Sequence, residues 1–142
     1  MIYTTYFANL KKLPTSIVPI SIAGKAPDGY RGPQFKNLAP KIEFFLKWKQ
    51  DHDNDAYIES YKRLILDKLD PKEVEDYLYF LSDAMDIALV CYEKPGNFCH
   101  RHLVSQWLRD ADIPVKEWEE NDHVLAVQKE NCGEKQAANL QS

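Results

Sequence analysis

Long apolar runs and excess basic charge are both missing from this chain. No hydrophobic stretch approaches the roughly 20 residues that a membrane-spanning helix needs, and the first residues, MIYTTYFANLKKLP, lack the charged start of a secretion signal. The net charge at pH 7 is -4, which argues against a concentrated basic face for nucleic-acid backbones. We therefore predict a cytoplasmic protein with no membrane association and no strong binding to nucleic acid.

Cysteine is scarce as well. The chain has three cysteines in 142 residues, an odd number that does not suit the disulfide framework of a small secreted domain. Cys91, Cys99 and Cys132 also fit no zinc pattern with the nearby His100 and His102, because the sequence has neither a C-x-x-C nor a paired H-x3-H motif. We therefore expect reduced thiols, no metal and no cofactor.

Apolar residues are nevertheless abundant enough for one core, since 44% of the chain is hydrophobic. Periodicity and β-branched content predict strands at 1–9, 16–24, 86–93 and 114–118, and helices at 40–50, 56–69, 71–81 and 100–113. The run at 86–93 is continuously apolar, as in a central parallel strand. This order predicts a three-layer α/β fold in which helices flank a small, mainly parallel, Rossmann-like sheet.

The C-terminal part of the chain sets the expected domain boundary. Residues 123–130 read as a further strand, so we predict a single α/β domain over residues 1–130. Residues 131–142 have little hydrophobic content and are expected to form a flexible tail. The sequence gives no indication of the oligomeric state.

The junction between the strand at 86–93 and the helix from residue 100 concentrates reactive side chains. Cys99 is expected at the N-cap, where the helix dipole and free N–H groups favour a thiolate or a bound anion. Arg101 in the first turn opposes the same dipole, so we expect it to have an anion or carboxylate partner. His100 could serve as a general base, and Glu93 as a base or a ligand for a hydroxyl group.

Other interpretations of these residues stay open. Cys99 is equally well explained as a small buried residue that caps a helix. Cys91 is suited to core packing, although it could also face Cys99 across the loop. The second glycine-rich loop, at residues 25–34, contributes Lys25, Tyr30 and Arg31, which could close over the same anion or simply be solvated.

The segment CYEKPGNFCHRHLV, with YRGPQFKNLAP and ESYKRLILDKLDP before it and VKEW after it, resembles a bacterial and phage family of uncharacterised proteins, domain of unknown function 488. The resemblance extends over residues 1–118. It implies a compact Rossmann-like α/β domain and no established reaction. The signature positions that it implies are Cys91, Glu93, Cys99, His100, Arg101, Tyr30, Gly32 and the turn at residues 38–40.

Three functions remain compatible with this sequence. The first is a thiol- or histidine-dependent enzyme that acts on an anionic small molecule, such as a nucleotide or a phosphorylated metabolite. The second is a non-catalytic module that binds a nucleotide-like ligand or a partner's carboxylate in the same pocket. The third is a thiol redox protein in which Cys91 and Cys99 form a reversible disulfide.

Overall fold

Four parallel strands form one sheet in the order β2-β3-β1-β4. The computed structural model describes residues 1–120. The strands are β1 (Ile2–Tyr6), β2 (Ile17–Ser21), β3 (Asp86–Cys91) and β4 (Val115–Glu117). β3 pairs with β2 on one side and with β1 on the other, so it is the central strand that its apolar run predicts. Pro19 is tolerated in β2 because that strand lies at the edge of the sheet.

Helices occupy the connections between the strands. The α-helices are α1 (Ile42–Asp51), α2 (Asn54–Leu64), α3 (Pro71–Leu81) and α4 (His100–Asp110), and the short 3-10 helices are η1 (Phe7–Lys12), η2 (Lys36–Leu38) and η3 (Leu66–Lys68). Asp70 is the N-cap of α3: its carboxylate accepts a hydrogen bond of 3.0 Å from the Glu73 backbone N–H. Local sequence signals therefore determine where this helix begins.

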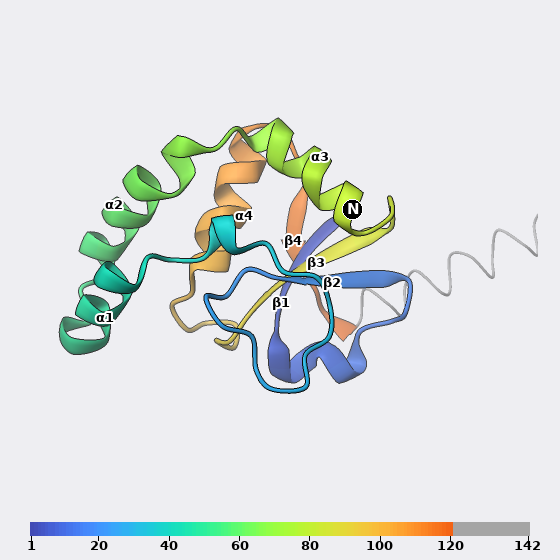
Figure 1. The fold of residues 1–142 in the computed structure, drawn as a ribbon, viewed down its shortest axis with the longest axis horizontal. Helices are drawn as coiled ribbons and strands as arrows, with labels where there is room; N and C mark the ends of the chain where they lie inside the picture. The colour runs from blue at the N-terminus through green and yellow to red at the C-terminus, as the bar shows by residue number, and fades with distance from the viewer. Residues whose placement is uncertain (121–142) are drawn as a thin grey trace, which may run out of the picture.

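The sheet separates two unequal layers (Figure 1). On one face, Ile87 and Leu89 of β3 share a core with Leu78 of α3 and Val104 of α4. On the opposite face, Ala88 packs in a smaller cluster with Ile17, Trp118, Tyr3 and Leu13, beside η1. The chain is thus a three-layer α/β fold with an all-parallel Rossmann-like sheet, which confirms the predicted fold class.

The α1–α2 pair reaches beyond the sheet in Figure 1 and is held there by aromatic contacts. The Tyr61 hydroxyl, fully buried, donates a hydrogen bond of 2.5 Å to the Leu38 carbonyl in η2. Phe44 of α1 meets Tyr57 of α2 edge-on, with ring centroids 5.1 Å apart. These contacts fix the pair relative to the rest of the fold, so that side chains of both helices can form one wall of a cavity at the sheet.

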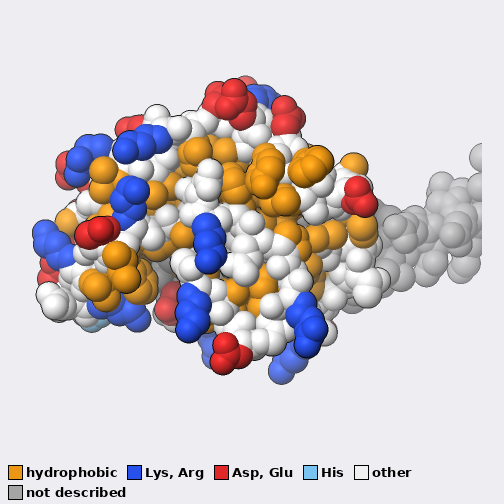
Figure 2. Space-filling model, viewed as in Figure 1, with side chains coloured by type: hydrophobic (Ala, Val, Ile, Leu, Met, Phe, Trp, Pro, Cys, Tyr) orange, Lys and Arg blue, Asp and Glu red, His pale blue; other side chains and the backbone are white. Residues whose placement is uncertain are grey.

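Hydrophobic side chains gather on the visible face over α3 in Figure 2. Within α3, the side chains of Tyr77 and Phe80 are 45% and 76% exposed. Among residues 1–120, no helix has the length and apolar character needed to cross a membrane. The predicted strand at 123–130 and the predicted tail at 131–142 lie outside the described residues.

Candidate functional site

A cavity lies where the carboxyl ends of β2 and β3 meet the start of α4. Its volume is about 700 Å³, and its position is the one at which open parallel sheets bind ligands. Its lining includes three groups of side chains. They are a cysteine–histidine group (Cys91, Cys99 and His100), an aromatic wall (Phe45, Trp48, Tyr57 and Phe98) and a charged rim (Lys25, Lys49 and Glu93).

The two cysteines occupy the two ends of the loop between β3 and α4. Cys91 is the last residue of β3, and Cys99 is the N-cap of α4, as expected. The loop turns at Gly96, whose φ of 90° favours glycine. The structure joins the two sulfur atoms in a disulfide, with Cα atoms 7.4 Å apart, which differs from the expectation of reduced thiols. The strand and the helix together therefore bring both thiols to one point at the cavity.

His100 lies beside this pair with a defined tautomer. Its Nε2 is 2.7 Å from the Ile22 carbonyl oxygen, which can only accept a hydrogen bond, so Nε2 carries the proton. Nδ1 is then unprotonated and lies 3.9 Å from Sγ of Cys99. Burial of the ring, with a smaller contribution from the Arg101 charge, lowers the pKa of His100 to about 4. The ring is therefore neutral near pH 7, with a free lone pair directed at the cysteines.

Arg101 has the carboxylate partner that its place in the first helical turn predicts. The partner is Glu117 at the end of β4, whose two carboxylate oxygens accept hydrogen bonds of 3.0 Å from Nε and Nη2 of the fully buried guanidinium. The Thr4 hydroxyl donates to the same carboxylate at 2.6 Å. The pair is a bidentate ion pair, the strongest geometry for arginine and carboxylate.

The remaining Arg101 nitrogen connects this ion pair to the cysteine loop. Nη1 donates to Sγ of Cys91 at 3.3 Å and to the backbone carbonyl of Glu93. Arg101 itself is not among the residues that line the cavity, whereas the exposed Glu93 side chain is. The structure therefore brings Cys91, Glu93, Cys99 and His100 together at the cavity and places Arg101 behind them.

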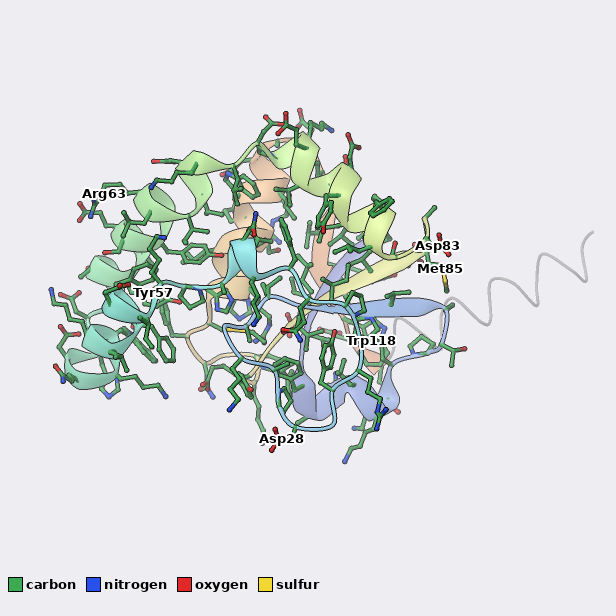
Figure 3. All side chains as sticks on the ribbon, in the orientation of Figure 1. Asp28, Tyr57, Arg63, Asp83, Met85 and Trp118 are labelled. Atoms are coloured by element: carbon green, nitrogen blue, oxygen red, sulfur yellow. A yellow bond between two sulfur atoms is a disulfide. The ribbon has the colours of Figure 1, made fainter. Side chains whose placement is uncertain are left out.

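The second loop contributes one cation to the cavity. Lys25 lines the rim, and its backbone carbonyl accepts a hydrogen bond from the Tyr92 hydroxyl, which ties the two loops together. Tyr30 instead turns inward, where its hydroxyl donates to the carbonyls of Pro19 and Pro33, and burial raises its pKa to about 12. Neither Tyr30 nor the exposed Arg31 is among the lining residues. Asp28 marks the outer end of this loop in Figure 3.

The aromatic wall is the part of the cavity that the sequence does not predict. The Trp48 and Phe98 rings lie 5.4 Å apart, and Phe98 meets Tyr57 edge-on at 4.9 Å (Tyr57 is labelled in Figure 3). The Trp48 indole N–H donates to the Asn54 side chain at 2.7 Å, which fixes the ring. Trp48, Tyr57 and Phe98 belong to α1, α2 and the loop before α4, so no local pattern groups them. The only feature of the sequence that could have suggested the aromatic wall is the number of aromatic side chains on these helices.

Comparison with known proteins identifies one relationship. Residues 8–112 match the family model described as the Active DUF488-N3 subclade. The matched segment includes both cysteines of the cavity, His100 and Arg101, and ends before Glu117. No curated protein and no solved structure matches the chain.

Proposed function

This chain belongs to the DUF488 family, and we propose that it is a thiol-dependent enzyme acting on an anionic, nucleotide-like small molecule. The observation that carries this proposal is the cavity, which Cys99 and His100 line together with the aromatic wall. Aromatic side chains stack on the flat faces of bases. Lys25 and Lys49 supply positive charge at the rim for a phosphate or carboxylate group.

Within this proposal each member of the cysteine–histidine group has a role. The Cys99 sulfur forms a bond to an electrophilic atom of the ligand, and the bond to the leaving group breaks with its electron pair. Nδ1 of His100 accepts the thiol proton and returns it to the leaving group. Glu93 is placed to accept a hydrogen bond from a ligand hydroxyl, and Arg101 holds Cys91 and the Glu93 backbone in position.

Alkylation of the reduced protein tests the assignment of the nucleophile. With limiting iodoacetamide, we expect Cys99 to be modified before Cys91, because its exposed fraction is 7% against 1% and it is the N-cap of α4. Peptide mass spectrometry measures the order. A nucleoside mono- or diphosphate that occupies the cavity should slow the modification of Cys99 and leave that of Cys132 unchanged.

Four outcomes would contradict parts of the proposed function of this site. Modification of Cys91 before Cys99 contradicts the proposed nucleophile. Nucleotides that neither bind, as judged by calorimetry, nor protect Cys99 contradict the proposed ligand class. A nucleotide that is converted equally well by wild type and Cys99→Ser would make the protein an enzyme that does not use this thiol, with Cys132→Ser as the matched control. A nucleotide that binds but is not converted by wild type would make it a binding module.

A redox function is the second candidate, and the disulfide between Cys91 and Cys99 favours it. In that reaction the two thiols lose two electrons and two protons to a disulfide substrate, and the substrate's sulfur–sulfur bond breaks to give two thiols. We expect oxidised glutathione to lower the number of titratable thiols under denaturing conditions from three to one, and a reductant to restore them. Two free thiols persisting at Cys91 and Cys99 would contradict this function.

A further inference from the structure

We propose that Cys91, Cys99 and His100 form a binding site for a soft divalent metal ion such as Zn²⁺ when the cysteines are reduced. The spacing along the sequence excludes a familiar zinc motif, but the fold brings the donor atoms together. Both Sγ atoms and one ring nitrogen lie within 4.8 Å of one another, and all three residues are buried. Two thiolates and an imidazole are a donor set that Zn²⁺ prefers.

The two sulfur atoms are bonded to each other in this structure, and once reduction lets them separate, the remaining distances suit a tetrahedral ion. With Zn–S near 2.3 Å and Zn–N near 2.0 Å, sulfur and nitrogen ligands are about 3.5 Å apart and two sulfur ligands about 3.8 Å. The observed separation of Nδ1 of His100 and Sγ of Cys99 is 3.9 Å. The Cα atoms of the two cysteines are 7.4 Å apart, beyond the roughly 4.4–6.8 Å usual for a disulfide. The backbone therefore leaves room for an ion between separated thiolates.

The groups behind the three donors also suit a metal. Nε2–H of His100 donates to the Ile22 carbonyl, which directs Nδ1 toward the sulfur atoms, and a backbone carbonyl is a common partner of metal-binding histidines. Arg101 donates to Sγ of Cys91 at 3.3 Å, and its own charge is balanced by Glu117. The N-terminus of α4 adds positive potential at Cys99. The Arg101 hydrogen bond and the N-terminus of α4 therefore both favour the deprotonated cysteines that a metal ion requires.

A fourth coordination position would face the cavity. All three donor residues line it, so a water molecule or a ligand atom could complete the tetrahedron. Three protein ligands with one open position characterise catalytic rather than structural zinc sites. A metal-bound Cys99 could not act as a free nucleophile. The metal-binding proposal therefore does not depend on the proposed nucleophilic role of Cys99, and each of the two can be correct without the other.

The metal and the disulfide are mutually exclusive states of the same sulfur atoms. Oxidation by a low-molecular-weight disulfide breaks both metal–sulfur bonds and the oxidant's sulfur–sulfur bond, and forms the bond between Cys91 and Cys99. Two electrons pass to the oxidant, two protons from solvent complete its two thiols, and the metal ion leaves. Zn²⁺ is redox-inert, so the cysteines alone change oxidation state.

Cobalt titration of the reduced, metal-free full chain tests this site. We expect about one Co²⁺ per chain, with tetrahedral ligand-field bands and sulfur-to-cobalt charge-transfer absorption, and displacement of the cobalt by Zn²⁺. Cys91→Ser and Cys99→Ser should each weaken binding by more than about 100-fold, beyond the 10–100-fold typical of outer-shell changes. Cys132→Ser is the matched control and should bind like wild type. Protein oxidised with glutathione disulfide should show no charge-transfer bands.

Alkylation of the wild-type chain gives a second readout that needs no variant to fold. Bound Zn²⁺ should protect Cys91 and Cys99 from iodoacetamide and leave the rate at Cys132 unchanged. Absence of thiolate–cobalt bands in the reduced protein, or bands that survive loss of both Cys91 and Cys99, would overturn the proposal. So would cobalt bands that remain in the oxidised protein. None of these measurements involves a nucleotide or turnover, so a failed enzyme assay leaves their interpretation unchanged.

Discussion

Replacing Arg101 by methionine is expected to lower the free energy of unfolding by about 3 kcal/mol, the low end of the cost of breaking a buried ion pair. The substitution leaves the Glu117 carboxylate without its bidentate partner. Glu117 retains 22% exposure, so water compensates part of the loss. Arg101→Met also removes the hydrogen bonds to Cys91 and to the Glu93 carbonyl. Urea denaturation in the presence of a reductant measures the change without a contribution from the disulfide.

A double-mutant cycle separates the ion pair from simple packing. Glu117→Leu alone should be at least as destabilising as Arg101→Met, because it leaves the fully buried guanidinium of Arg101 without its carboxylate partner. The double variant should be more stable than the sum of the two single effects predicts, since neither charge is then left alone. Arg109→Met, at an exposed position of the same helix, should change stability by less than about 0.5 kcal/mol. Additive single effects would show that the ion pair is not coupled.

The segment that runs from β3 into α4 could be predicted because every signal in it is local. Its apolar run marks a buried strand, and Cys99 precedes a helical period that starts at His100, where α4 does begin. The α3 cap at Asp70 is local for the same reason. A disulfide between Cys91 and Cys99 was one of several possibilities that the sequence allowed. The sequence could not select it, because a separation of eight residues permits contact between the two side chains without requiring it.

The partners of these residues could not be predicted, because they depend on how distant elements pack. Arg101 calls for a carboxylate, but the sequence offers 22 acidic residues and does not single out Glu117. That choice follows from the pairing of β4 with β1, which places Glu117 beside Thr4 and facing α4. Tyr30 shows the opposite case. A polar residue in a glycine-rich loop suggests a ligand, yet its hydroxyl closes the loop on two backbone carbonyls.

Truncation of the aromatic wall at Trp48 should have the largest effect on ligand binding. We expect Trp48→Ala to weaken the binding of a nucleoside phosphate by about tenfold or more, because losing one stacking partner costs about 1–3 kcal/mol per base. The Trp48 ring lines the cavity, lies beside Phe98 and is only partly buried. Its removal should therefore affect the ligand more than the fold. Isothermal calorimetry on the reduced protein measures the affinity, and urea denaturation measures the stability.

Two matched variants serve as controls for Trp48→Ala. Trp48→Phe keeps an aromatic face and should retain most of the affinity, although it loses the hydrogen bond to Asn54. Phe80→Ala removes a ring that is 76% exposed on α3 and does not line the cavity, so the affinity should not change. If Trp48→Ala binds nucleotides like wild type while Lys25→Ala and Lys49→Ala do not, the ligand is held by its charge alone. The aromatic wall would then be packing for the α1–α2 pair, and the nucleotide-like part of the proposed substrate would have to be abandoned.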